Sequence, residues 1–269
     1  MNPPNQTVPR LSLRVASVYG PSPDNRQWLQ LQDRFVQQNC AGIDVDFGIF
    51  LNGTQLETEG TTTHVLGHST DNLGHARGLE RVLAHFRAAS SRADGYLLLD
   101  SDCFPVHPHW MQALRHLMDR HAKRFAAPVR FENLEPYPHP CALYIDGAML
   151  DDPRLRFDES AVASNLLGEK VRDIGAGLRN LEEDLLPLVR TNTRNLHPIA
   201  AAVYNHLFYH HGAGSRGVTF RATHKYGYYA HWRDEGSPAE ADAIRQQLFC
   251  DPDGFIRGLL EPIRPIEGQ

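Results

Sequence analysis

The chain has 269 residues, of which 41% are hydrophobic and 22% are charged, and its formal net charge is −5. This length suits one large α/β domain, the acidic balance argues against a general nucleic-acid binder, and no apolar run approaches the roughly 20 residues that span a bilayer. Four cysteines without Cys-x-x-Cys spacing indicate free thiols, typical of a reducing cytoplasm, rather than a zinc site or a disulfide framework. We therefore expect a cytoplasmic protein without a transmembrane segment. Residues 1–10 are polar and proline-rich, so we expect a disordered leader there.

The first half of the chain alternates short apolar runs with segments of helical periodicity. Apolar runs of this length predict strands, and apolar residues spaced three or four apart predict helices. The alternation favours an α/β fold with a mostly parallel sheet flanked by helices. The predicted strands cover residues 11–19, 43–51, 65–67 and 95–100, and the predicted helices cover residues 28–36, 72–86 and 108–118.

The second half gives weaker signals. We expect strands at residues 125–129 and 141–145, separated by a proline-containing loop at 131–140, and a long mobile loop at 151–170. The helical segments are expected at residues 173–188, 198–208 and 239–249, with a glycine-containing loop at 210–216 and a proline-rich end.

Two aspartates follow the most apolar strand. Residues 96–99 read Tyr-Leu-Leu-Leu and end in Asp100, Ser101 and Asp102. Ligands of open α/β sheets bind outside the carboxyl ends of the strands. Two carboxylates this close repel each other unless a cation lies between them, and Mg²⁺ and Mn²⁺ take carboxylates together with phosphate oxygens. The triplet predicts a metal–diphosphate site, with a polar turn that caps the next helix as the alternative.

The ordered pair of segments NLGHARGLE, starting at Asn72, and YLLLDSD, ending at Asp102, resembles the GT-A glycosyltransferases, in particular family 2. The resemblance covers residues 11–115 best. It implies a GT-A-like Rossmann-type sheet in one catalytic domain at residues 11–269, with a nucleotide-sugar half at 11–115 and an acceptor half at 116–269. It also implies a nucleotide-diphosphate sugar donor, an acceptor that the sequence does not identify, and Mn²⁺ or Mg²⁺. The chain departs from the family at Asn52-Gly53-Thr54, where an acidic residue commonly contacts the base.

The resemblance also implies site residues. Asp100 and Asp102 would hold the metal, together with one of the adjacent His210 and His211, which point apart on any regular element. Asp173 would be the catalytic base of an inverting enzyme, with a helix-capping aspartate as the alternative. The candidate contacts to the donor are Tyr19, Asn52, Asn72, Arg77, Asp100, Ser101 and Arg216. Asn72 could instead be only a helix N-cap, Arg77 part of a solvated helix face, and Asn52 part of an ordinary turn.

Three other functions remain open at this point. A nucleotidyltransferase would need a glycine-rich phosphate loop with a basic residue after the first strand, and GPSPDNRQW from Gly20 does not supply it. A non-catalytic module could use the same cleft to bind a nucleotide or a glycan. A histidine-rich metal hydrolase is the third alternative.

Overall fold

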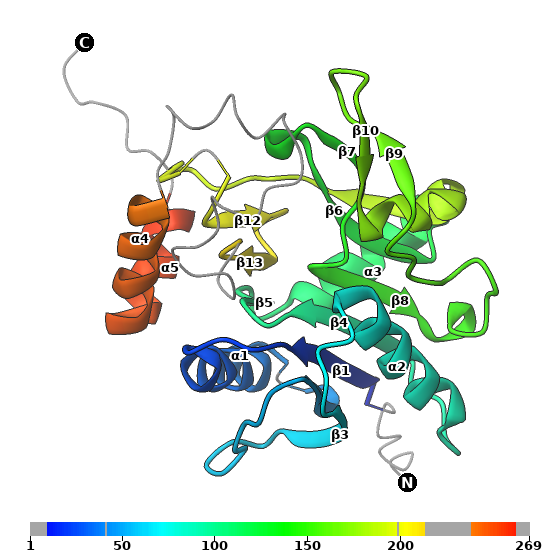
Figure 1. Ribbon diagram of the computed structural model, residues 1–269, viewed down its shortest axis with the longest axis horizontal. Coiled ribbons are helices and arrows are strands. Elements are labelled where there is room, and N and C mark those ends of the chain that lie inside the picture. Colours follow the sequence, from blue (N-terminus) through cyan, green and yellow to red (C-terminus); the bar gives the residue numbers. More distant parts are fainter. Residues whose placement is uncertain (1–9, 41, 198, 213–237, 262–269) are drawn as a thin grey trace, which may run out of the picture.

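The predicted first strand forms β1, which lies between β4 and β2 in an eight-stranded sheet. Figure 1 shows β1 beside β4. The computed structural model describes residues 10–40, 42–197, 199–212 and 238–261, so the predicted leader lies outside them except for Arg10. The strand order is β11-β6-β8-β4-β1-β2-β3, with β7 paired to β6. The strands are β1 (Ser12–Tyr19), β2 (Asp44–Asn52), β3 (His64–Ser69), β4 (Gly95–Asp100), β6 (Phe125–Arg130), β7 (Glu135–Pro138), β8 (Ala142–Asp146) and β11 (Leu185–Leu188).

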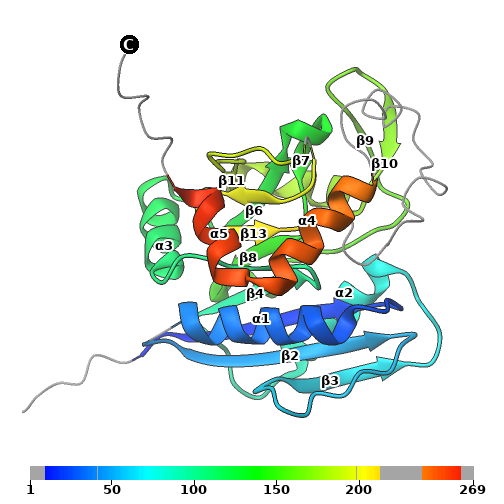
Figure 2. The same cartoon turned by 90° about the vertical axis from the view of Figure 1, so that its left-hand side faces the viewer.

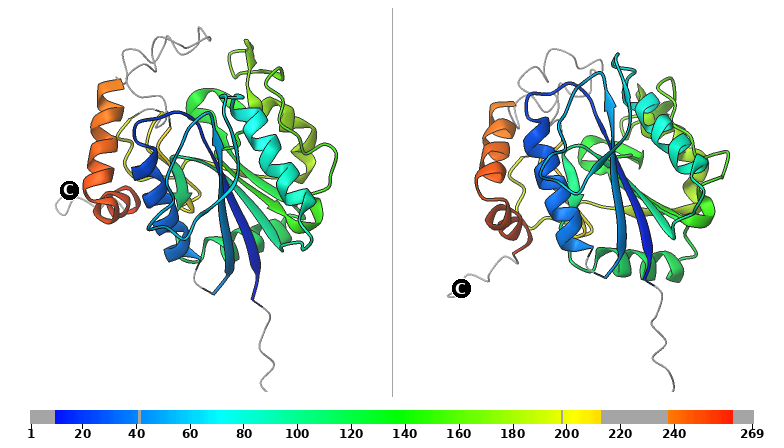
Figure 3. Two further views of the ribbon diagram at one scale, coloured as in Figure 1. Left: turned by 60° about the horizontal axis from the view of Figure 1, so that its bottom comes forward. Right: turned by 90° about the horizontal axis from the view of Figure 1, so that it is seen from below.

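Helices cover both faces of this sheet. Because side chains alternate along a strand, β1 sends Val15 into one apolar cluster and Ala16 into the other. The first cluster contains residues of α1 (Asn25–Asn39), α3 (Trp110–Arg120), α4 (Pro238–Cys250) and α5 (Pro252–Leu260). The second contains residues of α2 (His75–Ala88) and of the 3₁₀ helix η3 (Ile174–Asp184). Figure 3 shows α1 and α2 on opposite sides of the strands, and Figure 2 shows α4 and α5 beside α1.

Strand direction changes across the sheet. The four strands β3, β2, β1 and β4 are parallel, and so are β6 and β11. The strand β8 is antiparallel to both β4 and β6. The expected mostly parallel sheet flanked by helices is therefore confirmed, with antiparallel pairing where the second half joins. Val18 pairs with Asp100 and Tyr19 with Leu51, so the carboxyl ends of β1, β2 and β4 meet at one edge.

A small antiparallel sheet lies beside this edge. It consists of β12 (Ala202–Tyr204), β13 (Phe208–His210) and β5 (Cys103–Pro105), in the order β12-β13-β5. The helix predicted at residues 198–208 was therefore wrong. Ala201, Asn205 and His206 have positive φ values of 54°, 48° and 58°, which a right-handed helix does not allow.

Other parts of the second half also differ from the prediction. The predicted helix at 173–188 ends as η3 at Asp184, and its last four residues form β11. The predicted loop at 131–140 contains η1 (Phe131–Asn133) and β7. The predicted mobile loop at 151–170 contains β9 (Val162–Ser164) and ends at the first residue of β10 (Lys170–Arg172), with which β9 pairs. The proline-rich end contains α5, because Asp251 accepts a bond from the Gly254 N–H and a proline stands in the first turn, both helix-start signals. Among the described residues, no helix is both long and apolar enough to cross a membrane.

Candidate metal centre

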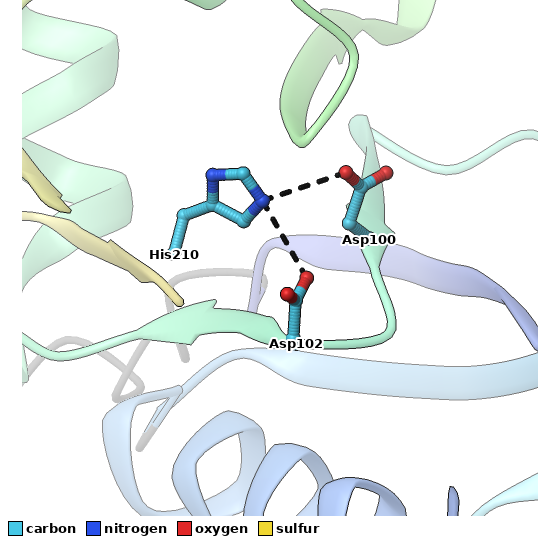
Figure 4. Close-up of side chains that lie close together, drawn as sticks. All are labelled: Asp100, Asp102 and His210. Atoms are coloured by element: carbon cyan, nitrogen blue, oxygen red, sulfur yellow. Dashed lines mark ion pairs between the residues drawn. The ribbon is translucent and has the colours of Figure 1, made fainter. Parts of the chain in front are cut away.

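Asp100, Asp102 and His210 bring three metal-ligating atoms together at the carboxyl end of β4 (Figure 4). The Nε2 atom of His210 lies 3.6 Å from Oδ2 of Asp100 and 3.5 Å from Oδ1 of Asp102. All three atoms lie within 4.8 Å of one another. Asp102 and His210 are only 4% and 5% exposed. Two ligands at right angles around Mg²⁺ lie about 3 Å apart, so the spacing and the oxygen and nitrogen donors fit a small divalent ion.

The chain does not stay extended between the two aspartates. Strand β4 ends at Asp100, the chain turns at Ser101 and Asp102, and β5 begins at Cys103. Pairing of His210 with Cys103 in the β13–β5 ladder then carries the imidazole to the turn, and the His211 N–H donates to the Asp102 carbonyl at 3.0 Å. The alternative role of capping the next helix does not apply, since the N-cap of α3 is His109.

Gln32 supports this turn from inside the core. Its Nε2 donates to the carbonyl oxygens of Asp100 at 2.9 Å and Cys103 at 2.7 Å. The Tyr19 hydroxyl donates to Gln32 Oε1 at 3.0 Å, and both side chains are fully buried. Tyr19, which we expected to contact a nucleotide base, therefore packs beneath the site. Gln32 was missed because a glutamine inside a helix carries no sequence signal of its own.

Charge in the cluster favours a cation. Burial alone raises the pKa of Asp100, but the neighbouring imidazoles of His75 and His210 outweigh burial and lower that pKa. Burial acts to lower the pKa of His210, but the Cys141 sulfur and the Asp102 carboxylate raise that pKa well above its ordinary value. The buried carboxylate of Asp102 and the partly exposed carboxylate of Asp100 are thus balanced by positive charge, which either imidazolium protons or a metal ion can supply.

His211 takes no part in the cluster. Its Nδ1 lies 2.9 Å from the Tyr209 hydroxyl, and its ring centroid lies 5.4 Å from that of Trp28. Burial lowers the pKa of His211 to about 4. The two neighbouring histidines do point apart, and His210 is the one that lies in the cluster.

His75 joins the site from the other side and was not among the predicted site residues. It is the first residue of α2, and its Nε2 lies 3.0 Å from Oδ1 of Asp100. The signal that could have found it is its place at a helix start next to the predicted Asn72-Leu73-Gly74 segment.

Asn52 and Asn72 hold the start of α2. The N-cap of that helix is Gly74, so the alternative role of Asn72 as the N-cap does not hold. The Oδ1 atom of Asn72 accepts from the Gly74 N–H at 3.0 Å and from Asn52 Nδ2 at 3.2 Å. Asn52, 2% exposed, also donates to the Gly74 carbonyl at 3.0 Å and accepts from the Leu73 N–H at 2.8 Å. Both asparagines therefore hold the loop in the described structure.

The remaining predicted residues lie around this centre. Ser101 is buried in the turn, and Arg77 is exposed on α2. Arg216 lies outside the described residues. Asp173 is the N-cap of η3, as the alternative had it, and accepts from the Gly175 N–H at 2.8 Å.

A close backbone contact joins the start of η3 to β7. A Cβ on Gly175 would lie 1.9 Å from the Pro138 carbonyl oxygen, so η3 and β7 touch without room for a side chain. The next residue, His139, has its ring centroid 6.1 Å from that of His210. The start of η3 therefore packs against the end of β7, directly before His139.

No family model matches the chain, and no curated protein matches it. Among solved structures it is similar to the mannosyltransferase PcManGT from Pyrobaculum calidifontis in complex with GDP-Man and Mn²⁺, at a TM-score of 0.40 and 8% identity over 55% of this chain and 48% of that one. It is also similar to S. aureus TarS, at a TM-score of 0.44 and 11% identity over 67% of this chain and 36% of TarS. A third similar structure is the galactosyltransferase LgtC in complex with donor and acceptor sugar analogs, at a TM-score of 0.34 and 12% identity over 49% of this chain and 57% of LgtC. The chain spans about half the length of these proteins or less, except for LgtC, where it spans slightly more.

Proposed function

We propose that this chain is a metal-dependent glycosyltransferase that moves a sugar from a nucleotide-diphosphate sugar to an acceptor hydroxyl. The observation that carries the proposal is the convergence of Asp100, Asp102 and His210 at the carboxyl end of a parallel strand, where open α/β sheets bind their ligands. The GT-A resemblance of the sequence and the solved structures named above agree with this class of reaction without carrying it.

The three converging side chains would hold Mn²⁺ or Mg²⁺. Such an ion, when bound, neutralises charge on the departing diphosphate as a Lewis acid. The chain itself adds the start of α2, where helix N–H groups and the helix dipole favour an anion. Arg77, exposed two residues after His75, would donate to a phosphate oxygen.

Asp173 is our candidate for the base that takes the proton of the acceptor hydroxyl, in a transfer that inverts the anomeric carbon. The start of η3, which Asp173 caps, packs against Pro138, the residue before His139, and this contact is what supports the proposal. Asn is as good an N-cap as Asp, so Asp173→Asn keeps the cap of η3 and removes the proton acceptor. We expect transfer to fall by ~10²–10⁴-fold, the usual contribution of general base catalysis, while donor affinity stays within a few-fold. Asp158→Asn, at an exposed acid, is the matched control.

The test of the function is release of nucleoside diphosphate from a panel of sugar donors, with Mn²⁺ and with excess EDTA. Asp102→Asn should abolish Mn²⁺ binding and lower turnover by orders of magnitude, because it removes a ligand charge. Asp119→Asn, an exposed acid on α3, should match the wild type.

Three outcomes, from this assay and from parallel measurements of donor binding and pyrophosphate release, contradict the proposal. Full activity in excess EDTA removes the metal from the mechanism. Donor binding without turnover identifies a binding module, and pyrophosphate release from a nucleoside triphosphate and a sugar phosphate identifies a nucleotidyltransferase.

A further inference from the structure

The two oxygens of Asp100 face two different imidazoles. Oδ2 lies 3.6 Å from Nε2 of His210, on the side of Asp102, and Oδ1 lies 3.0 Å from Nε2 of His75. His210 belongs to the candidate ligand set and His75 does not. A carboxylate that ligates a metal through one oxygen is commonly held by a hydrogen bond at the other.

The start of α2 is built so that His75 faces this oxygen. Asn52 is bonded to both the Leu73 N–H and the Gly74 carbonyl, directly before His75. Gly53 has a φ of +71°, and a Cβ there would lie 2.5 Å from the Asn72 nitrogen, so the end of β2 touches the loop. The side chain of Asn52 and the backbone of Gly53 thus fix the first turn of α2 against the sheet edge that carries Asp100.

We propose that His75 is a positioning residue that holds Asp100 in the orientation in which its Oδ2 binds the divalent ion. Without His75, the carboxylate of Asp100 could rotate about its χ angles, and Oδ2 would spend only part of its time facing Asp102 and His210. This inference rests on the metal site of the proposed function. It adds a requirement that neither the Asp-x-Asp motif nor the three-residue cluster contains.

The test is Mn²⁺ affinity of the metal-free protein, measured from the electron paramagnetic resonance signal of free Mn²⁺, with no sugar donor present. His75→Ala should weaken binding about 10–100-fold, the usual effect of removing a partner of a metal ligand. His75→Gln should stay within a few-fold of the wild type, because its Nε2 donor reaches a similar position. His85→Ala and His85→Gln, at an exposed histidine of the same helix, are the matched controls, and Asp102→Asn is the reference for a lost ligand.

The outcomes separate this inference from the proposed function. If Asp102→Asn loses Mn²⁺ but His75→Ala binds it as the wild type does, the positioning role is refuted and the metal site stands. Equal losses in His75→Ala and His75→Gln would also refute it, because a donor at the right place would then not suffice. A wild type that binds no Mn²⁺ overturns both proposals. If circular dichroism shows that His75→Ala does not fold, His75→Gln is compared with His85→Gln. A Mn²⁺ affinity of His75→Gln within a few-fold of that of His85→Gln supports the positioning role, and a larger loss refutes it.

Discussion

The buried amide of Gln32 offers the sharpest test of how the site is supported. Gln32→Leu keeps the volume of the side chain nearly constant and removes three hydrogen bonds at once. Two carbonyl oxygens, of Asp100 and Cys103, lose their donor, and the Tyr19 hydroxyl loses its acceptor. Because Tyr19 and Gln32 are fully buried, water does not replace these partners without a rearrangement.

A buried polar group left without a partner costs about 1–3 kcal/mol. Three such groups would together cost more than one of them, but relaxation and the more favourable transfer of Leu into the core offset part of this cost. We therefore expect the free energy of unfolding to fall by about 3 kcal/mol. For a chain of this size 1 kcal/mol moves Tm by roughly 2–4 °C, so we expect a Tm lower by about 6–12 °C. Mn²⁺ affinity should fall as well, since the two released carbonyls flank the turn that carries Asp102.

Urea unfolding and Mn²⁺ titration of Gln32→Leu measure both effects. Gln30→Leu, at an exposed position of the same helix, controls for the new leucine and should change stability by less than about 0.5 kcal/mol. Equal stabilities for Gln32→Leu and Gln30→Leu would refute the view that Gln32 supports the turn.

Three further predictions concern glycines and an ion pair. Gly53→Ala should lower the free energy of unfolding, measured in urea, more than Gly60→Ala does. Both glycines have positive φ (71° and 81°), but of the two only Gly53 would place a Cβ within 4 Å of another atom. Equal losses would mean that backbone strain alone sets the cost. Gly175→Ala should lower stability and sugar transfer far more than Gly177→Ala, whose Cβ would meet ordinary contacts at 3.5 Å or more, and near-normal values for both would contradict the close contact of η3 with β7. The Arg154 guanidinium lowers the pKa of Asp152 to about 2, so this ion pair stabilises the fold above about pH 4 and the stabilisation is lost as the pH falls through about 2. Asp152→Asn should therefore destabilise the protein at neutral pH by at most about 2 kcal/mol, less after screening, and an undiminished difference near pH 2 would contradict the assignment.

Long periodic segments were predicted well because their side-chain pattern is local. The apolar run before Asp100 and the apolar stripe after Asn72 can each be read within a dozen residues, and they became β4 and α2. The three-residue strands β12 and β13 were not predicted, because a segment that short has no measurable period. Their conformation is set by pairing with β5 and by residues with left-handed backbone.

The site residues differ in the same way: some have a local sequence signal, and others depend on contacts between distant segments. Asp100 and Asp102 were predicted because both follow one strand, and His210 because the family resemblance implied a metal ligand at one of two adjacent histidines. The roles of His75, Gln32 and Tyr19 depend on contacts between segments far apart in the chain. The sequence shows a helix start, a mid-helix amide and a strand end, and only tertiary packing tells which of them faces the metal centre and which lies beneath it.

The pairing of β13 with β5 has a consequence for the order of events during folding. His210 follows Asp102 by more than one hundred residues, and joining such distant segments costs loop-closure entropy before any contact repays it. A nascent chain that has not reached β13 already carries both aspartates but lacks the imidazole. Tight binding of Mn²⁺ should therefore begin only when the second half has docked on the first. The rate of metal uptake during refolding would then report on the last step of assembly and not on the initial collapse. Once captured, the ion would hold the two halves together by mass action.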